Sequence, residues 1–504
     1  MIENKYDFFL NEFNKYEKIL QDYKNDNSKV FTDENFHPNY RIAEPELENE
    51  KPPIELYPSD NSVTWERIDE YYKAPLFKDS KIHPLFVNQG ALGSCYFISA
   101  LSRVAKQSDL VQTLFEKKLP DKILGKVQDS INIECGAVVV YFRVFGRRTP
   151  VLIDTRVPFK NGQPFFSRPI TKDKSPWFCL VEKAFAKLNG SYSNIHGGQF
   201  AYSIYSLFGY YYKNFHLTNN FNYNNLKILK YQMNGCLMDT SIIAGKGHVQ
   251  KAEKKGLLDL HSYLLVKVRK YKDMIFYQIR NPWGRKVWNG DYSIKSELWT
   301  PELKEVLREK PGRGLFWMLD KDYYTYFTDV QVSKPINPHW IMKMFEFRPK
   351  PSPSDSYKID IQQQFICQLK DEIPDGKKAR FRILVEKRNS QYKNSNNVII
   401  LFYGINGGKK YVKYDSNSGM KYISNKHFLS CTLPIKNKNE IVTFTIVFIA
   451  PPDVDCDCYV NVFCEYDFDL YDIDKPAVKF SRGETRGAAF DNFSINAPNS
   501  ALVL

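Results

Sequence analysis

The spacing of apolar residues changes along the chain, and this change constrains the fold more than any other feature. Helical spacing with short strands fills residues 61–205, and strand patterns dominate residues 206–335. The segment Arg348–Pro353 then carries three prolines at alternate positions, which favours a stiff connection between elements. After it, short apolar or alternating runs are separated by Gly, Asn, Asp and Pro turns. The pattern predicts a mixed helix-and-strand region followed by an antiparallel β-sandwich.

Several strands are predicted individually from runs rich in β-branched and aromatic residues. These runs are Ala137–Phe142, Tyr263–Val268, Met274–Ile279, Ala379–Val385, Val398–Tyr403, Val442–Ile449 and Tyr459–Phe463. None approaches the roughly 18 apolar residues that a membrane-spanning helix needs. The N-terminus also lacks the basic and then apolar plan of a signal peptide.

The composition excludes several classes of protein. Of 504 residues, 43% are hydrophobic and 25% are charged, which is ordinary for a globular chain and unlike a disordered or collagenous one. The net charge of +14 comes from basic residues that form no long block, so we interpret it as a solvated surface and expect no nucleic-acid partner. Nine scattered cysteines argue against a disulfide framework. Without a secretion signal, the expected location is cytoplasmic, where thiols stay reduced.

An amphipathic helix is predicted close to the N-terminus, within a first segment that we place at residues 1–26. Its aromatic and aliphatic residues recur at helical spacing among Lys and Glu. We expect this helix to dock on the body of the protein, and association with a membrane surface is the weaker alternative. The polar, proline-containing residues 25–60 that follow predict an extended lead-in with little regular structure.

The clearest chemical signal lies in the segment Gln89–Leu101. A glycine-containing loop leads into a helical pattern that begins at Cys95, and the dipole at a helix N-terminus favours a thiolate. The sequence Gly93-Ser94-Cys95-Tyr96 is typical of a papain-type nucleophile. Gln89 lies six residues before Cys95, where its amide is able to donate to a developing oxyanion. A lone cysteine at a helix start is more often structural, so the assignment depends on partners elsewhere.

Two later residues supply those partners. His261 lies in a strand pattern, and Asn281 follows another strand and precedes Pro282, which disfavours a helical asparagine. We expect His261 to pair with the Cys95 thiolate and then to protonate the leaving amine. Asn281 would orient the imidazole without placing a full charge beside it. Trp283 would cover the bond between His261 and Asn281. The other seven histidines have no such context.

At these residues the sequence resembles the calpain family of intracellular cysteine proteases. The family motif Gln-Gly-x-Leu-Gly-Asp-Cys-Trp-Phe/Leu is matched from Gln89 to Phe97, with Ser94 for Asp and Tyr96 for Trp. Four further stretches match in family order, which together cover about residues 30–335: Phe31–Pro38, Trp65–Ile68, Val181–Tyr192 and Ile279–Gly284. The resemblance implies a cysteine endopeptidase that hydrolyses peptide bonds of proteins.

The resemblance also implies an α+β fold with a two-lobed, papain-like core. Lobe one, 27–205, is mainly helical and carries Gln89 and Cys95, and lobe two, 206–335, is β-rich and carries His261 and Asn281. A protein substrate would bind as an extended peptide in the cleft between the lobes. The remaining domains implied are a calpain-type β-sandwich at 340–475 and a C-terminal β segment at 476–504, either a partial second sandwich or permuted strands.

Calcium is implied by the family, because each lobe of a conventional calpain core binds one ion. Calcium needs several oxygen ligands, mostly carboxylates. The six aligned positions here carry none: Phe86, Ser193, Val287, Ile294, Arg313 and Leu315. We therefore predict no metal site and no cofactor, and a core that calcium does not switch, either because the lobes are aligned constitutively or because another signal controls them. The alternative is that a short misalignment hides a ligand, or that Asp291 or Glu297 substitutes. No Asp-x-Asp-x-Asp-Gly loop occurs, so a calmodulin-like domain is not expected.

Two other classes of function remain open from the sequence. Leu260 precedes His261 at a position that is usually glycine in calpains, and a side chain there would crowd the cleft or change the preferred substrate. This residue favours, mildly, a catalytically silent homologue that acts as a scaffold through its β-sandwich. A transferase of the transglutaminase type is the third class, although its histidine is more often oriented by Asp than by Asn.

Overall fold

The computed structural model describes most of the chain between residues 14 and 473. The described residues are 14–15, 18–19, 21–23, 25–36, 63–72, 82–115, 135–144, 147–171, 175–242, 246–307, 312–336, 339–347, 361–389, 398–405, 419–424, 428–449 and 456–473. The predicted C-terminal segment 476–504 and the lead-in beyond residue 36 up to 60 lie outside them.

The chain forms two compact units, which we treat separately. The core unit comprises Met1–Gly209 and Asn214–Lys334, and the C-terminal unit comprises Tyr210–Lys213 and Pro335–Leu504. The core unit mixes helices and strands, in agreement with the predicted α+β class. No helix among the described residues is long and apolar enough to cross a membrane.

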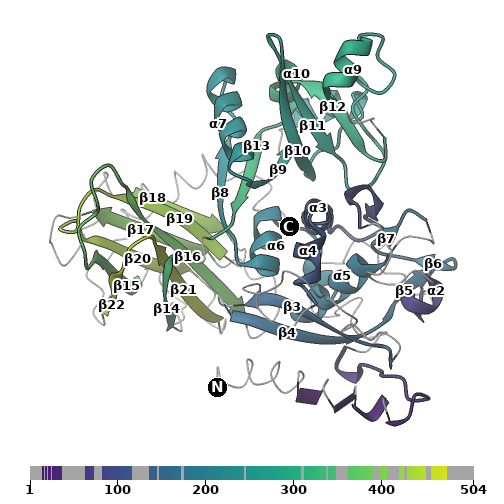
Figure 1. Ribbon diagram of the computed structural model, residues 1–504, viewed down its shortest axis with the longest axis horizontal. Helices are drawn as coiled ribbons and strands as arrows, with labels where there is room; N and C mark the ends of the chain where they lie inside the picture. The colour runs from purple at the N-terminus through teal and green to yellow at the C-terminus, as the bar shows by residue number, and fades with distance from the viewer. Residues whose placement is uncertain are drawn as a thin grey trace. The chain divides into compact units, whose positions relative to one another are not determined.

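The first part of the core unit, called the helical half, runs to the end of α6. Its helices are α2 (Ile68–Tyr71), α3 (Cys95–Val104), α4 (Ser108–Gln112), α5 (Trp177–Leu188) and α6 (Phe200–Phe208). Its strands are β1 (Val63–Arg67), β2 (Val87–Asn88), β3 (Ala137–Val144), β4 (Arg147–Asp154), β5 (Arg156–Lys160), β6 (Gln163–Pro164) and β7 (Arg168–Pro169). Three short 3-10 helices are η1 (Glu34–Phe36), η3 (Pro84–Phe86) and η6 (Ser193–Ile195). Helix α3 contacts α6, β2 and β10, and most of its residues are buried. Helices α3 and α6 are labelled in Figure 1.

The second part of the core unit, called the sheet half, is built on a six-stranded sheet in the order β12-β11-β10-β9-β13-β8. The pairs from β12 to β13 are antiparallel, and the first residues of β8, up to Lys213, are counted with the C-terminal unit. The strands are β8 (Tyr211–His216), β9 (Leu237–Ile242), β10 (His261–Tyr271), β11 (Met274–Arg280), β12 (Leu315–Leu319) and β13 (Asp329–Lys334). The helices are α7 (Phe221–Met233), α8 (Lys246–Lys254), α9 (Pro301–Leu307) and α10 (Asp320–Tyr326).

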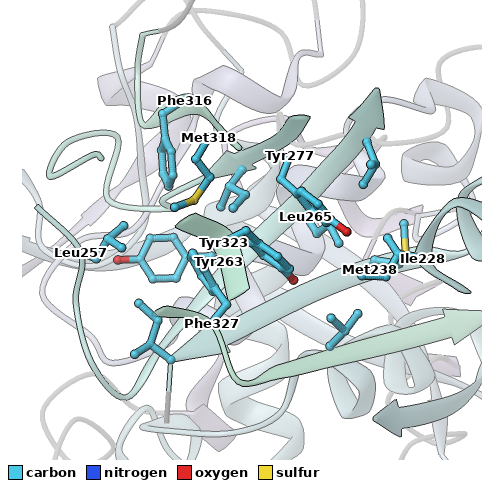
Figure 2. Packing of buried hydrophobic residues seen from close by; sticks show 14 of the residues in the cluster. Ile228, Met238, Leu257, Tyr263, Leu265, Tyr277, Phe316, Met318, Tyr323 and Phe327 are labelled. Atoms are coloured by element: carbon cyan, nitrogen blue, oxygen red, sulfur yellow. The ribbon is translucent and has the colours of Figure 1, made fainter. Parts of the chain in front are cut away.

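An aromatic cluster holds the strands of this sheet in place (Figure 2). The rings of Tyr277 on β11 and Tyr323 on α10 stack with centroids 4.0 Å apart, and Tyr263 on β10 meets Phe327 edge to face. Such pairs add roughly 0.5–1.5 kcal/mol each beyond the burial of their area. The cluster therefore fixes β10 and β11, the two strands whose ends carry His261 and Asn281.

In the described residues of the C-terminal unit the regular elements are all strands, arranged in two antiparallel sheets. The first has the order β14-β21-β16-β19 and the second β18-β17-β20-β15-β22. The strands are β14 (Ile341–Phe347), β15 (Ile361–Leu369), β16 (Ala379–Asn389), β17 (Val398–Ile405), β18 (Gly419–Ser424), β19 (Phe428–Ile435), β20 (Val442–Ile449), β21 (Cys456–Cys464) and β22 (Phe468–Ile473). Both sheets contribute to one buried cluster, in which Phe381 of the first meets Phe468 of the second edge to face.

The N-terminal residues that the structure describes lie on the helical half. Residues 14–15, 18–19, 21–23 and 25 are helical. Ile19, Tyr23 and Phe31 pack against a buried cluster on the β3–β4 hairpin. The amphipathic pattern predicted this kind of docking.

Candidate active site

The nucleophile candidate lies where the sequence predicts it, at the first residue of a helix. Helix α3 begins at Cys95, which is partly exposed. Ser94 before it does not cap the helix, because its Oγ donates to the buried Glu182 at 2.7 Å. Gly93 lies so close to His196 that a Cβ atom there would approach the imidazole within 2.6 Å. The close packing of this loop explains the small residue before the Ser-Cys pair.

His261 and Asn281 meet at the ends of adjacent strands. His261 is the first residue of β10, and its Nε2 lies 2.9 Å from Oδ1 of Asn281. Nδ2 of Asn281 donates to the carbonyl of Lys286 at 2.8 Å, so its oxygen faces the histidine. An amide oxygen only accepts, and Nε2 of His261 therefore carries the proton in the neutral ring, leaving Nδ1 as the basic nitrogen.

Asn281 is itself held by its neighbours. Its backbone N–H donates to the carbonyl of Gly314 at 2.8 Å, and its Oδ1 also accepts from the backbone N–H of Trp283 at 2.9 Å. Gly314 has a φ of +85°, and a Cβ atom there would collide with the Asn281 carbonyl. Glycine is therefore required at position 314, directly before β12, for the backbone to come close enough to bond Asn281.

Two aromatic rings enclose the imidazole of His261. The Trp283 ring lies 5.1 Å from it between centroids and the Tyr263 ring 4.9 Å, both in edge-on geometry. Only 5% of His261 is exposed, and this burial lowers the pKa of the imidazole to about 4 despite the bond to Asn281. Trp283 thus lies where the sequence analysis expected a cover for the histidine.

The strand that carries His261 packs on the helix that carries Cys95. Helix α3 contacts β10, and the backbone N–H of Ser262 donates to the Cys95 sulfur. Burial raises the pKa of the Cys95 thiol to about 11, although hydrogen bonds from the backbone N–H groups of Ser262, Tyr96 and Cys95 lower it. The helix-dipole argument favoured a thiolate, but a dipole contributes only about 0.3–1 kcal/mol at an exposed site, and desolvation outweighs it here.

Gln89, from the helical half, is hydrogen-bonded to the sheet half one residue after Asn281. Its backbone N–H donates to the carbonyl of Pro282 at 3.1 Å. Its side-chain Nε2 donates to the carbonyl of Leu92 at 2.6 Å, which holds the amide in the loop before Cys95. The loop contact occupies one of the two Nε2 hydrogens.

Two polar residues beside the site escaped the sequence analysis. Asp239 on β9 is buried and accepts from the hydroxyl of Ser262 at 2.9 Å, and its charge raises the pKa of Cys95. Burial raises the pKa of Asp239 itself well above its ordinary value. The second residue is Arg280, which directly precedes Asn281. A charged residue within or at the end of a largely buried strand is the signal that could have identified both.

The positions that align with the calcium ligands of the family differ in their surroundings. Phe86 lies in η3, and the guanidinium of Arg313 lies over its ring at 5.5 Å from the centroid, so two of these positions touch across the halves. Ile294 is exposed and Leu315 is buried. No group of three or more His, Cys, Asp or Glu side chains able to hold a metal ion gathers in the described part of the chain.

Leu260 adopts a backbone conformation that favours glycine. Its φ is +47°, its backbone N–H donates to the carbonyl of Ile242, and its side chain is 58% exposed. A left-handed conformation costs an L-residue roughly 1–2 kcal/mol. The strain, directly before His261, gives a physical reason for the glycine that calpains usually have there.

Relief of this strain is testable. We expect Leu260→Gly to keep or raise the free energy of unfolding by up to about 1 kcal/mol, because the strain relieved exceeds the extra flexibility of glycine in the unfolded chain. Leu260→Ile should lower it, since β-branched residues tolerate positive φ poorly. Thermal denaturation measures both. Leu298→Gly is the matched control, being 48% exposed without a positive φ, and it should not stabilise. Equal effects at the two leucines would contradict the assignment of strain.

Comparison with known proteins identifies the family of the chain. The model of the family described as "Calpain family cysteine protease" matches residues 31–334. The calpain-type cysteine protease DEK1 of Arabidopsis thaliana is 29% identical over 324 residues, 61% of this chain and 14% of that protein. Calpain-14 of Homo sapiens is 29% identical over 54% of this chain and 39% of its own length. Calpain-5 of Mus musculus is 31% identical over 56% of this chain and 47% of its own length.

The chain thus spans less than half the length of these relatives, and the match lies mainly in the core unit. The family match covers more than half of the 504 residues and includes the loop, the two strands and the helix described above. The chain belongs to the calpain family of cysteine proteases.

Proposed function

We propose that this protein is a cysteine endopeptidase that hydrolyses peptide bonds of proteins through Cys95, His261 and Asn281. The observation that carries the proposal is the bond from His261 Nε2 to Asn281 Oδ1, on a strand that packs against the helix beginning at Cys95. The bond leaves Nδ1 of His261 as the nitrogen that accepts the thiol proton. Family membership supports the same activity.

The first half of the reaction forms a thioester. Each group alone is neutral near pH 7, because burial raises the pKa of Cys95 and lowers that of His261. The thiol proton passes to Nδ1 as the sulfur attacks the carbonyl carbon, and the carbonyl oxygen becomes an oxyanion. The remaining Nε2 hydrogen of Gln89 is the donor we assign to this oxyanion. The imidazolium then protonates the amide nitrogen, the C–N bond breaks and the amine leaves.

The second half regenerates the enzyme. His261 takes a proton from water as the water oxygen attacks the thioester carbon. The carbon–sulfur bond breaks, the carboxylic acid leaves, and the proton returns to sulfur. Asn281 keeps the imidazole oriented through both halves, and Trp283 and Tyr263 limit the access of water to the ring.

The proposal also covers the arrangement of the lobes, the type of the C-terminal sheets and the compartment. We interpret the helical half and the sheet half as the two lobes of a papain-like core, with an extended substrate peptide bound between them. The two sheets of the C-terminal unit are interpreted as a calpain-type β-sandwich, and the cytoplasm as the compartment.

The activity is tested with an epoxysuccinyl inhibitor and a protein substrate. The full chain should cleave casein, and the inhibitor should label Cys95 and stop cleavage in proportion to labelling. Cys236→Ser is the control, because Cys236 is buried in the core of the sheet half, and this variant should be labelled and inhibited like the wild type. A folded chain that neither cleaves casein nor reacts at Cys95 would favour the silent scaffold.

We further propose that the core needs no calcium. The aligned positions lack carboxylates, and Arg313 lies against Phe86 where two of them meet. We expect a calcium chelator to leave the rate of casein cleavage unchanged, and calorimetric titration of the full chain to show no micromolar binding of calcium to the core. A requirement for added calcium, or saturable binding abolished by changing Asp291 or Glu297, would contradict this proposal.

A further inference from the structure

Arg280 reaches from the sheet half into the helical half. It is the last residue of β11, directly before Asn281, and only 1% of it is exposed. Its Nη1 donates to Oγ of Ser102 on α3 at 2.7 Å. Its Nη2 donates to the carbonyl of Val87 at 2.7 Å and to Oδ1 of Asn88 at 3.2 Å. One side chain thus connects the helix of the nucleophile, the strand before Gln89 and the strand before Asn281.

The partners of Arg280 are unusual because none is a carboxylate. All three acceptors are neutral oxygens, and Nε has no hydrogen-bond partner among the described residues. A buried charge without a counter-charge lowers stability, and an apolar side chain of similar size is often the more stable choice. Burial accordingly lowers the pKa of the guanidinium to about 9. The arrangement is therefore better suited to fixing geometry than to stabilising the fold.

The contacts around Arg280 follow the same path across the halves. Gln89, one residue after Asn88, donates its backbone N–H to Pro282, one residue after Asn281. Gly284 lies so close to Asn88 that a Cβ atom there would be 2.9 Å from its Oδ1. The segment Val87–Gln89 therefore runs beside Arg280–Gly284, and any slip between them would separate the oxyanion donor from the histidine.

We propose that Arg280 is a positioning residue that holds the two halves in the arrangement in which His261 faces Cys95. This inference rests on the proposed function and deepens it. Arg280 acts through Ser102, Val87 and Asn88, and does not itself touch the reacting atoms.

The test compares turnover per active site with folding. Arg280→Met removes all three hydrogen bonds, and we expect kcat per site titrated with the epoxide to fall roughly 10²-fold, because small misplacements of reacting groups cost about that much. Arg280→Lys should recover part of the loss, since an ammonium reaches fewer of the acceptors. Arg285→Met is the matched control, because Arg285 is exposed on the same loop, and it should leave kcat unchanged.

A second readout separates alignment from stability. The rate at which iodoacetamide alkylates Cys95 is measured against pH. In the wild type, pairing with His261 should give appreciable alkylation below pH 7, whereas Arg280→Met should shift the profile toward that of a thiol without a histidine partner. A merely structural role would lower the melting temperature and leave this profile and kcat per site unchanged, which would overturn the proposal.

Two further outcomes keep the proposal separate from the proposed function. Should Arg280→Met fail to fold, Ser102→Ala, which removes one hydrogen bond, and Arg280→Lys carry the test. Both should reduce kcat per site and shift the alkylation profile in the same direction, and wild-type behaviour in both would overturn the role of Arg280. A wild-type chain that shows low-pH alkylation but no cleavage of any peptide would refute the endopeptidase and retain the alignment.

Discussion

Replacing Cys95 with serine is expected to lower kcat for peptide hydrolysis by about 10⁴-fold or more. A hydroxyl gives up its proton far less readily than a thiol, and burial at this site already raises the pKa of the thiol to about 11. The serine variant therefore cannot form the anion that attacks the peptide. Turnover of a fluorogenic peptide by the purified full chain measures the effect, and substantial activity in the folded variant would exclude Cys95 as the nucleophile.

His261→Ala should be nearly as severe, because nucleophile and base act as a unit. The double variant with Cys95→Ser should then lose little more than either single variant. His216→Ala is the control, since His216 is mostly exposed and pairs with Asp329 rather than with the site. Independent, multiplying losses in the double variant would argue against a shared mechanism.

The dependence of kcat/KM on pH also tests the pairing of Cys95 with His261. Burial lowers the pKa of His261 to about 4, so the imidazole stays able to accept the thiol proton well below the ordinary histidine value of 6.5. We expect the acid limb of kcat/KM to lie below pH 6.5, and to report the coupled pair rather than either group alone. Asn281→Ala should move this limb, because the asparagine hydrogen bond raises the pKa of the histidine.

The residues of the candidate site were predictable because their signals are local. The glycine loop before Cys95, the strand at His261 and the proline after Asn281 each constrain the backbone within a few positions. The runs Met274–Ile279 and Val442–Ile449 match β11 and β20 to within a residue. The role of Trp283 beside the imidazole followed from its place two residues after Asn281.

Other features depend on contacts between distant parts of the chain and were not predictable. Arg280 and Ser102 are 178 positions apart, and nothing near either residue indicates the other. The effect of burial on the Cys95 thiol was not predictable either, because a helix start is visible in the sequence whereas desolvation depends on how β10 packs on α3. The sheet order, in which β13 pairs with β9 rather than with β12, is likewise a tertiary outcome.

Substitutions in a group of buried ion pairs formed by helix α5 are expected to change the free energy of unfolding more than the other substitutions considered. Lys183 and Asp154 form an ion pair whose side chains are 1% and 0% exposed. Nζ of Lys183 also donates to the carbonyls of Asp154 and Arg156, and the Asp154 carboxylate accepts from the backbone N–H of Asp33 at 2.8 Å. Asp33 in turn pairs with Lys187 on α5 at 2.9 Å, so the group ties the lead-in, β4 and α5 together.

Asp154→Asn keeps the shape of the side chain and leaves Lys183 buried without its counter-charge. We expect the free energy of unfolding to fall by about 3–5 kcal/mol, as for other broken buried pairs. Adding Lys183→Met should recover part of this loss, because the fully buried uncompensated charge is then gone, while Arg156, which also pairs with Asp154, is partly exposed. Glu302→Gln is the matched control, since its ion pair with Lys272 is mostly exposed, and it should cost less than about 1 kcal/mol.

The same group predicts how stability depends on pH. Burial opposes ionisation of Asp154, but Lys183 and the hydrogen bond from Arg156 outweigh it and hold its pKa below the ordinary 3.8. The folded state therefore binds fewer protons than the unfolded state between these two values. The contribution is fully present above pH 3.8 and is lost as pH falls through the folded pKa. Denaturant titrations should show a smaller loss of stability on acidification in Asp154→Asn than in the wild type, and equal losses would remove Asp154 from this role.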